Sequence, residues 1–592
     1  MVRFDIPSCD RSDVTVLCEL LEVSDALAQI LVRRGFEDPL RARAFLAADE
    51  RHELDAFAGL RDAADSILAS ARAGRRITIH GDYDVDGVCS TAILVRTLRI
   101  LGARVDWFLP DRADGYGLST DTVRRLSQRG TELLITVDCG ITAVEEVALA
   151  GSLGIETIVS DHHLPRADGI LPDAPIVHPA LCGYPCGDLC AAAVAHKLAQ
   201  AILEAAGHEP NVAEEDLDLV SLATIADVVP LIGENRNLVR RGLRALAATA
   251  KPGLRALMAV ARVQPGKVDE RAVGFALAPR INAAGRLYRA DAALELILTE
   301  DPVRAAQIAD ELDRANSERR HTEQTIRIQA EAQVARLDRD GPRSAYVLAG
   351  EGWHPGVIGI VASRLAERHR RPVVLIALDG EGGRGSGRSV EGYDLLAGLT
   401  ACSEHLARYG GHKAAAGVEL ERDSVAGFAQ ALDAHAAHAL RAEDLIARER
   451  VDAIVNGPQL DMELAEELGR LSPFGRGNPS VSLMVADAVL SDVRPMGEGK
   501  HVRFTVESDG ASARAVAFGN EGRLGVAEGE RVQATFALEI NEWRGAVEPR
   551  LVLRHAQSAP KEATLKPCPK AGPAQSTLFP LPTPVAAAAA QS

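Results

Sequence analysis

The stretch "RITIHGDYDVDGVCSTAILVRTLRILG", residues 76–102, decides the fold of this chain. It starts with a short apolar-leaning strand up to His80 and continues from Gly87 as a helix-length apolar segment. Between the two lie Asp82, Asp84 and Asp86. Like charges gathered at the mouth of a strand repel one another unless a cation neutralises them. The stretch therefore predicts the first strand and helix of an α/β unit, with a binding site between them.

The same alternation continues along the chain. The segments "RVDWFLP", "LLITVDCG" and "ETIVSDHH" are typical of strands, and helical patterns of ten or more residues separate them. Short strands that alternate with helices indicate βαβ units and a parallel sheet. Ligands of such sheets bind at the carboxyl ends of the strands. We therefore expect a multidomain α/β protein whose site lies at that edge.

Length and composition limit the class of protein. A chain of 592 residues exceeds one domain, and 47% apolar with 25% charged residues is ordinary for a soluble protein. No apolar run is long enough for a bilayer and no signal-peptide core is present, which favours a cytoplasmic protein over a membrane or secreted one. The nine cysteines are expected to be reduced thiols. A net charge of −17 leaves nucleic acid open as a partner, because a basic groove can be local.

Changes of pattern predict where the domains lie. A long polar helical segment near residues 310–337 is typical of a helix that bridges two domains. Five strand-like runs after residue 480 fit a small closed barrel such as an OB-fold. We expect a helical N-terminal region (1–75), a parallel-sheet domain (76–250), a helical connector (251–340), a second α/β domain (341–445), the barrel domain (446–556) and a disordered tail (557–592).

Acidic and imidazole side chains recur at four predicted strand ends. A single Asp there is more often a helix cap, but four clusters at one sheet edge are not explained by capping. Asp and His donors together suit Mn²⁺ or Mg²⁺, and two such ions serve displacement at phosphorus. The pattern therefore predicts a two-metal phosphoesterase built from His80, Asp82, Asp84, Asp86, Asp138, Asp161, His162, His163 and Asp227.

These motifs resemble the DHH phosphoesterase family. The four signature segments are matched by "DYDVDG" (82–87), "VDCG" (137–140), "SDHH" (160–163) and "ADVVPL" (226–231). Over roughly residues 50–555 the chain is similar to the branch of single-strand-specific exonucleases. That similarity rests on "PRINAAGR" (279–286), "WHPGVIGIVASRL" (353–365), "GRGSGRS" (383–389), "GGHKAAAG" (410–417) and "LSPFGRGNP" (471–479).

The resemblance implies a role for each acidic or imidazole group. One ion would be held by His80, Asp84 and Asp138. The other would be held by Asp86, Asp138, His162 and Asp227, so that Asp138 bridges the two. His163 would stabilise charge on the scissile phosphate or donate a proton, and Asp161 would orient the imidazoles. Asp82 stays open between metal ligand, outer partner and helix cap.

The second α/β domain resembles the DHH-associated (DHHA1) type and would complete a cleft. Its glycine amides, with a hydroxyl and a guanidinium, suit an anion pocket. The expected contacts to substrate phosphates or DNA are Ser386, Arg388, His412, Arg280, Asn282 and Arg112. For each lone arginine, a surface ion pair is the alternative.

The resemblance implies an enzyme that digests single-stranded DNA from the 5′ to the 3′ end in repair and recombination. It would release 5′-mononucleotides by two-metal hydrolysis with Mn²⁺ or Mg²⁺. A pocket for a terminal 5′-phosphate gives that polarity, because only a strand end can fill it. The alternatives are a DHH phosphodiesterase for short RNA or cyclic dinucleotides and a non-catalytic relative that binds single strands.

Three further segments bear on partners. Phe504 and Trp543 could stack on bases at the barrel, although core packing is the favoured role of Phe504. "QSTLF" (575–579) resembles a short motif that binds the replication sliding clamp, and chance resemblance is an equal alternative. Cys182, Cys186 and Cys190 lack a fourth ligand at a familiar metal spacing. We expect a nucleoid-associated monomer, with single-strand-binding protein as a further partner and no membrane contact.

Overall fold

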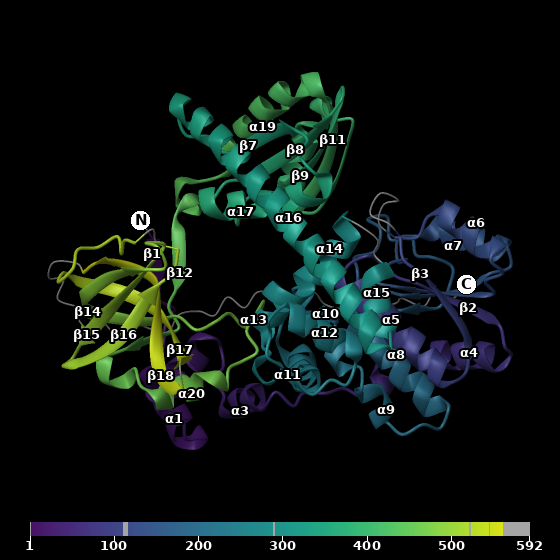
Figure 1. The fold of residues 1–592 in the computed structure, drawn as a ribbon, viewed down its shortest axis with the longest axis horizontal. Coiled ribbons are helices and arrows are strands. Elements are labelled where there is room, and N and C mark those ends of the chain that lie inside the picture. The colour runs from purple at the N-terminus through teal and green to yellow at the C-terminus, as the bar shows by residue number, and fades with distance from the viewer. Residues whose placement is uncertain (1, 111–116, 288–290, 520–521, 544, 560–592) are drawn as a thin grey trace, which may run out of the picture.

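The computed structural model describes residues 2–110, 117–287, 291–519, 522–543 and 545–559. Figure 1 shows three bodies, and one long helix runs between two of them. The predicted multidomain α/β architecture with an all-β barrel domain is confirmed. None of the helices in these ranges is long and apolar enough to cross a membrane.

A five-stranded parallel sheet forms the centre of the first body. Its strands lie in the order β3-β2-β4-β5-β6. Strand β4 is buried along its whole length, as expected for a parallel sheet with helices on both faces. Because β2, β4 and β5 run parallel, their carboxyl ends lie at one edge. The strands are β2 (Arg76–His80), β3 (Arg104–Phe108), β4 (Leu133–Val137), β5 (Glu156–Ser160) and β6 (Ile176–Val177).

Helices cover this sheet and extend away from it. Helix α5 is buried on almost every side, because it packs between the sheet and the helices α8 and α10. The helices of this body are α4 (Leu60–Arg72), α5 (Val85–Ile100), α6 (Thr120–Gln128), α7 (Val144–Ser152), α8 (Ala191–Ala205), α9 (Asn211–Glu214), α10 (Leu217–Ala226), α11 (Gly233–Ala247), α12 (Pro252–Val260), α13 (Glu270–Ala272), the π-helix η4 (Val273–Leu277), α14 (Ala278–Leu287) and α15 (Asp291–Leu298).

Helix α16 (Pro302–Leu337) belongs to two cores. Ile308 and Leu312 near its start pack into the core of the parallel-sheet body. Ile326 and Val334 near its end pack into the core of the second α/β domain. The helix therefore joins the two bodies through apolar packing at both ends, as Figure 1 shows.

The second α/β domain contains a five-stranded mixed sheet in the order β10-β11-β9-β8-β7. Helix α17 covers one face, and α18 and α19 pack on the other. The strands are β7 (Tyr346–Glu351), β8 (Val373–Asp379), β9 (Gly382–Arg388), β10 (Arg408–Gly411) and β11 (Ala415–Glu421); the helices are α17 (Pro355–His369), α18 (Leu395–Ala401) and α19 (Val425–Ala439).

The third body is a closed barrel. Strand β14 pairs with both β15 and β17, and this second pairing closes the five strands β14-β15-β16-β18-β17. Strand β13 extends the sheet beside β14, and α20 packs against β17 and β18. The bounds are β13 (Ala453–Val455), β14 (Leu483–Met496), β15 (His501–Ser508), β16 (Ala511–Ala517), β17 (Arg531–Trp543), β18 (Ala546–Ser558) and α20 (Met462–Gly469).

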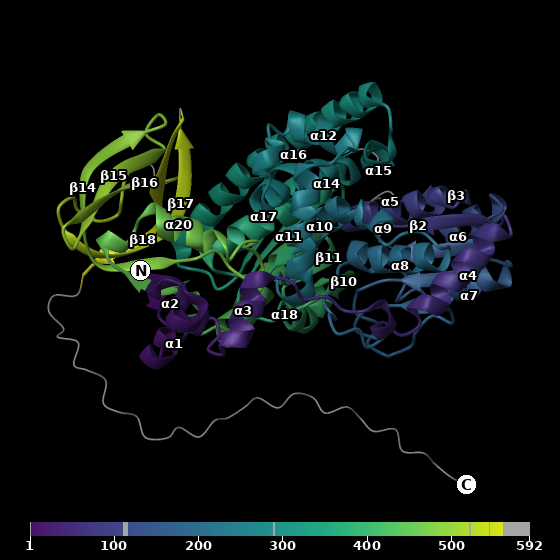
Figure 2. The same ribbon diagram turned by 90° about the horizontal axis from the view of Figure 1, so that it is seen from below.

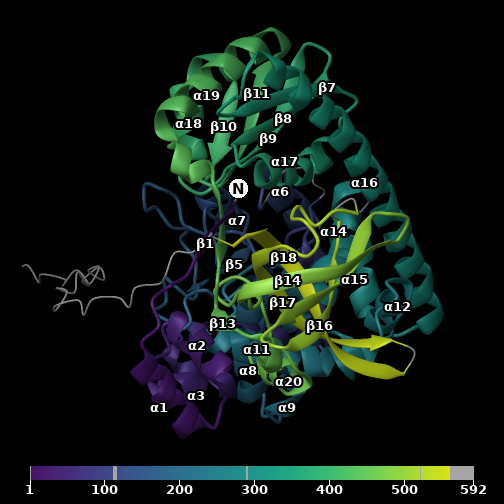
Figure 3. The same cartoon turned by 90° about the vertical axis from the view of Figure 1, so that its left-hand side faces the viewer.

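The first part of the N-terminal region, residues 2–47, lies with the barrel, whereas α4 belongs to the parallel-sheet body. Helices α1 (Arg11–Leu21) and α2 (Asp25–Arg33) bury Leu17 and Leu27 in the barrel's core cluster, and they lie beside the barrel in Figure 2. The region was expected to be entirely helical, but it begins with strand β1 (Val2–Asp5). This strand, labelled in Figure 3, pairs in parallel with β12 (Ala447–Arg450), and a four-residue partner strand so far along the chain leaves no local sequence signal.

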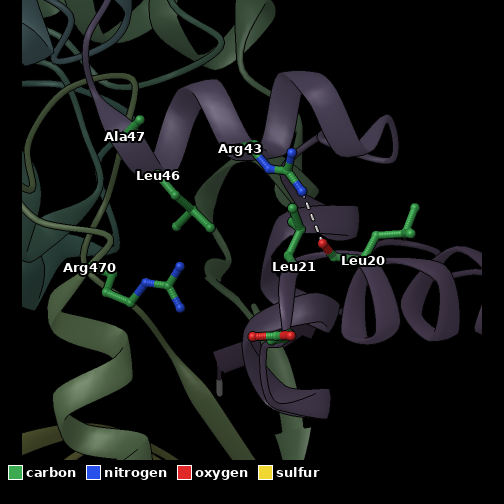
Figure 4. A pocket seen from close by; sticks show the side chains of 7 residues that line it. Leu20, Leu21, Arg43, Leu46, Ala47 and Arg470 are labelled. Carbon is green, nitrogen blue, oxygen red and sulfur yellow. Dashed lines mark hydrogen bonds between the residues drawn. The ribbon is translucent and has the colours of Figure 1, made fainter.

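Arg236 on α11 links the parallel-sheet body to the N-terminal helices and to the "LSPFGRGNP" segment beside the barrel. The side chain is fully buried, and its guanidinium donates hydrogen bonds to the backbone oxygens of Phe45 (3.1 Å), Leu471 (2.8 Å) and Arg470 (3.1 Å). Burial lowers the pKa of Arg236 to about 10. Figure 4 shows the adjoining pocket between α1, helix α3 (Pro39–Ala47) and Arg470, far along the chain from the acidic motifs.

Candidate metal centre and nuclease site

The loop after β2 brings three carboxylates to the sheet edge. Asp84 caps helix α5, because its Oδ1 accepts hydrogen bonds from the backbone N–H groups of Asp86 (2.9 Å) and Gly87 (3.1 Å). A Cβ atom on Gly87 would lie 2.5 Å from the backbone of Asp82, so only glycine lets the loop fold this tightly. Asp84 therefore is a helix cap, as the alternative interpretation held. Capping involves only Oδ1 of its carboxylate, so it does not occupy Oδ2.

Asp138 and Asp86 are buried in the centre of the cluster. Asp138 follows β4 with a φ of 61°, a conformation that costs energy for a residue other than glycine and that persists mostly at functional sites. The two carboxylate oxygens of Asp86 accept hydrogen bonds from the backbone N–H groups of Ala191 and Ala192, each at 2.7 Å. These amides begin helix α8, and no motif in the sequence had marked them.

His162 ties the cluster together. Its Nε2 lies 3.2 Å from Asp138 Oδ1, 3.6 Å from Asp86 Oδ2 and 3.9 Å from Asp227 Oδ2. Donor atoms of Asp86, His162 and Asp227 all lie within 4.8 Å of one another, which is close enough to share an ion. Residues from four separate motifs of the sequence thus meet at one point.

Asp82, Asp84 and Asp138 form a neighbouring group with the same spacing of their oxygens. Asp82, which sequence reasoning had left open, is therefore brought together with two of the expected ligands. His80 is fully buried beside them, and its Nε2 makes no hydrogen bond to any residue that the structure describes. Burial lowers the pKa of His80 to about 4, so the imidazole is neutral and able to act as a ligand.

The charges of the cluster call for cations. Burial raises the pKa of Asp138 well above its usual value, and the charges of Asp86 and Asp84 raise it further. Burial and the charge of Asp84 likewise raise the pKa of Asp227 to about 6. Carboxylates crowded in this way, with neutral imidazoles among them, are the donors that Mn²⁺ and Mg²⁺ take. The residues therefore fit a two-ion centre.

His163 differs from its neighbour because it is paired with Asp161. Its Nδ1 lies 2.9 Å from Asp161 Oδ1, and 42% of the side chain is exposed. Burial by itself would lower the pKa of His163, but the Asp161 carboxylate outweighs it and the pKa is raised. Asp161 also accepts a hydrogen bond from the Ile141 N–H at 2.9 Å, which holds it in place. The pair presents a partly exposed imidazole, whose protonated form Asp161 favours, 3.8 Å from Asp138 Oδ1.

Asp227 corrects one prediction. The "IADVVPL" segment was expected at a strand end, but Asp227 follows the last residue of helix α10. Residues Leu217–Thr224 of this helix are all buried, including the polar Asp218, Ser221 and Thr224, so this run has no exposed face. Periodicity cannot separate a run of that kind from a buried strand. The carboxylate nevertheless reaches the centre from the opposite side of the cluster.

In the second α/β domain, Ser386 and Arg388 lie together on β9. The Arg388 guanidinium donates to Ser386 Oγ at 3.0 Å, and burial lowers the pKa of this arginine. His412 is exposed in the turn between β10 and β11, with its backbone N–H donating to the Ala415 oxygen at 2.8 Å. Strands β9 and β11 are neighbours, so the expected phosphate contacts of this domain share one sheet.

Helix α14 connects this domain with the metal loop. Asn282 Oδ1 accepts a hydrogen bond from the Val85 N–H (3.1 Å), and Arg286 donates to the Gly356 oxygen at the start of α17 (2.7 Å). Arg280 pairs with Asp313 on α16 at 2.8 Å, so the ion-pair alternative describes this structure. Arg112 lies outside the described residues, as do the "QSTLF" segment and the side chain of Trp543.

The barrel carries an aromatic group that the sequence had not singled out. Phe504 is buried, as its favoured core role requires. Phe518 is 49% exposed, lies against the His501 ring at 5.4 Å and has the Arg550 guanidinium 5.9 Å from its own ring. One exposed residue at the end of a strand gives little sequence signal, because its neighbours come from other strands.

Family models match three parts of the chain. Residues 76–224 match the DHH family N-terminal domain, residues 341–437 the DHHA1 domain and residues 451–555 the RecJ OB domain. Together with the acidic centre, these matches define a DHH phosphoesterase. The resemblance seen in the sequence is thereby confirmed.

Relatives narrow the class further. The chain is 39% identical to the single-stranded-DNA-specific exonuclease RecJ of Bacillus subtilis, over 94% of this chain and 71% of the relative. The chain belongs to the RecJ family of single-stranded-DNA-specific exonucleases, and it is a metal-dependent nuclease.

Solved structures agree with this assignment. Crystal structures of RecJ from Thermus thermophilus match with TM-scores of 0.81 in the complex with Mn²⁺ and 0.76 in the complex with Mg²⁺. They are 34% and 32% identical, and the matches cover 94% and 95% of this chain and 80% and 79% of those chains. The predicted choice of Mn²⁺ or Mg²⁺ is confirmed at the level of the family.

Proposed function

We propose that this chain digests single-stranded DNA from its 5′ end and releases 5′-mononucleotides. The observation that carries the proposal is the meeting of two donor groups, one around Asp86, His162 and Asp227 and one around Asp82, Asp84 and Asp138. His80 completes the second group in this proposal, because its buried Nε2 has no hydrogen-bond partner in the described part of the chain. Two divalent ions, when bound, supply the Lewis-acid charge that a phosphodiester displacement needs.

The protein's own side chains then have distinct tasks. Asp138 belongs to the group with Asp82 and Asp84, and its Oδ1 lies 3.2 Å from Nε2 of His162 in the other group, so it connects the two halves of the centre. The protonated His163 imidazole stabilises negative charge on the scissile phosphate and donates its proton to the departing 3′-oxygen. Asp161 keeps that imidazole oriented and charged, because its carboxylate contacts Nδ1 of the ring.

Polarity follows from the second α/β domain. A terminal 5′-phosphate carries more charge than an internal diester, and Ser386, Arg388 and His412 offer the hydroxyl and cations that such a group binds. Arg280 joins this pocket in the proposal by releasing Asp313 and binding the phosphate, and Asn282 lies on the way to it. The contact expected of Arg112 stays a prediction from the sequence. Because one chain supplies all of these groups, the enzyme acts as a monomer.

The barrel holds the strand that trails from the centre. Phe518, with His501 and Arg550 around it, provides a face on which a base can stack beside a positive charge. Such contacts tolerate every base, which suits an enzyme that digests strands of any sequence. This activity serves DNA repair and recombination in the cytoplasm, at the nucleoid.

A labelled-strand assay tests the proposal. Time-resolved digestion of 5′- and 3′-labelled single strands in Mn²⁺, Mg²⁺ or chelator should release the 5′ nucleotide first and only with metal. Asp138→Ala should abolish it, and a matched dinucleotide should be a poor substrate. Release of the 3′ nucleotide first would reverse the polarity, and full activity of Asp138→Ala would refute the assignment of the centre.

The partners are a separate part of the proposal. The tail segment "QSTLF" (575–579) supports binding to the replication sliding clamp, and the single-stranded substrate supports encounters with single-strand-binding protein. Deletion of residues 573–592 should abolish clamp binding in a pull-down and leave nuclease activity intact. Unchanged clamp binding would refute the role of the tail.

A further inference from the structure

Helix α14 touches both the metal loop and the second α/β domain. Its Asn282 Oδ1 accepts a hydrogen bond (3.1 Å) from the N–H of Val85, the first residue of α5. One turn further along, the Arg286 guanidinium donates to the backbone oxygen of Gly356 (2.7 Å), the second residue of α17. Residues four apart are neighbours on a helix, so a single turn of α14 connects the two bodies. Figure 1 shows α14 beside α16, where α16 passes from one body to the other.

The contact with Val85 completes the cap of α5. The N–H groups in the first turn of a helix have no partner within the helix. Asp84 Oδ1 accepts those of Asp86 and Gly87, and Asn282 accepts that of Val85, which is buried. Without Asn282 this buried N–H would lose its acceptor. Asn282 therefore holds in place the loop that presents the Asp84 carboxylate to the metal centre.

The backbone of α14 also lies directly against the metal loop. A Cβ on Gly285 would lie 2.7 Å from the backbone oxygen of Tyr83 and 3.1 Å from its Cβ. Any side chain at Gly285 would therefore displace the loop between Asp82 and Asp84. Glycine is a poorer helix former than alanine, so this close approach and not the helix itself explains the glycine. The position of α14 thus determines the position of the loop.

At its other end α14 contacts the helix on which the phosphate pocket lies. A Cβ on Gly359 of α17 would lie 2.9 Å from Ser386 Oγ and 3.1 Å from Nη2 of Arg388. Both pocket side chains therefore pack against α17, one turn after its contact with Arg286. Arg388 in turn donates to Ser386 Oγ at 3.0 Å. A displacement of α17 would carry the pocket with it.

These contacts form one series from the phosphate pocket through α17 and α14 to the metal loop. A strand whose terminal phosphate occupies the pocket is cut where it reaches the metal centre. The number of nucleotides that fit between the two is the length of the released product. The spacing between pocket and centre therefore decides that length.

We propose that α14 is the spacer between the phosphate pocket and the metal centre. In this proposal Asn282, Gly285 and Arg286 are positioning residues, which restrict each cut to a single nucleotide. The proposal rests on the proposed nuclease function and its 5′-phosphate pocket, and it adds the part of the protein that measures the product.

Product length tests the link to the second α/β domain. In single-turnover digestion of 5′-phosphorylated single strands in Mn²⁺, the wild type should release mononucleotides, whereas Arg286→Met should also release dinucleotides, resolved by mass spectrometry. The preference for 5′-phosphorylated over 5′-hydroxyl strands should fall about tenfold, and Arg286→Lys, which keeps a donor, should restore part of it. Arg304→Met is the matched control, because Arg304 pairs with Glu295 at 2.7 Å near the start of α16.

A small diester separates spacing from chemistry. Hydrolysis of bis(p-nitrophenyl) phosphate does not use the terminal-phosphate pocket, so Arg286→Met should hydrolyse it at the wild-type rate. An equal loss on this diester and on single strands would place the effect of Arg286 in the metal centre and overturn its role in spacing.

Mn²⁺ binding, measured by electron paramagnetic resonance, tests the contact with the metal loop. Gly285→Ala should weaken Mn²⁺ binding about tenfold, because the added methyl group displaces the loop that carries Asp84. Gly151→Ala on α7 is the matched control, since a Cβ there would meet no atom of the described chain within 4 Å. Unchanged Mn²⁺ binding by Gly285→Ala would refute the positioning of the loop by α14.

The remaining outcomes are distinct from one another. If Arg286→Met releases only mononucleotides and keeps the full preference for a 5′-phosphate, α14 is not the spacer. If the wild type does not digest single strands or does not prefer a 5′-phosphate, the proposed function itself is wrong. Thermal melting identifies variants that fail to fold, and Asn282→Ala, which breaks the spacer at its other end and should also release dinucleotides, then decides the matter.

Discussion

Asp227→Asn should stabilise the metal-free protein while abolishing its activity. The Asp227 carboxylate is 28% exposed, lies next to Asp86 and Asp84 and has its pKa raised from 3.8 to about 6. Each unit of pKa corresponds to about 1.4 kcal/mol, so ionising this group in the folded protein costs about 3 kcal/mol. Asparagine keeps the shape and removes the charge, and it therefore removes that cost.

The sign of the pH dependence follows from the same shift. Because the folded protein holds this proton more tightly than the unfolded chain, stability falls as the pH rises from about 4 through the folded pKa of about 6. In chelator at pH 7.5, Asp227→Asn should melt about 6–12 °C above the wild type, given the usual scaling for a domain of 150–250 residues. Near pH 4.5 the gap should shrink to about a third of that size.

Thermal melting followed by circular dichroism measures this directly. Asp218→Asn is the matched control, since Asp218 is also buried but pairs with Lys251 at 2.8 Å, and its loss should lower the melting point. Saturating Mn²⁺ should reverse the order by raising the wild type more than Asp227→Asn. If Asp227→Asn melts at or below the wild type in chelator at pH 7.5, the electrostatic account of the centre is wrong.

Further predictions concern the centre and the domain junction. His163→Ala should lower kcat by about 10²- to 10⁴-fold. The kcat of the wild type should fall as the pH rises above the raised pKa of His163. If kcat of the wild type and of His163→Ala depend on pH in the same way, His163 does not donate the proton. Chelation should abolish digestion, and added Mn²⁺ or Mg²⁺ should restore it in the same assay; activity that survives chelation would oppose the two-ion centre. Arg236→Met should cost about 3–5 kcal/mol in urea denaturation, because buried carbonyls lose their donor, whereas Arg244→Met on the exposed face of α11 should cost almost nothing. Equal losses for both arginines would refute the junction role.

Much of the centre could be predicted because its ligands follow secondary structure directly. His80, Asp138 and His162 each stand at or just after the end of a strand, and parallel strands bring such ends to one edge. Asp227 could be named but not placed, since the helix before it is buried on nearly every side and a segment of that kind resembles a buried strand in sequence. Asp82 could not be assigned at all, because its partners depend on how tightly the loop folds around Gly87.

By itself the sequence determined the order of the domains, the parallel sheet and the chemistry of the metal donors. These features depend on local periodicity and on residue types, and both can be read from short stretches of sequence. Only the tertiary structure decided that the turn after α10 meets the "SPFGRGNP" segment, and that Arg236 joins three distant segments. Such meetings arise from the packing of separate elements across hundreds of residues, and that packing leaves no periodic trace in any one of them.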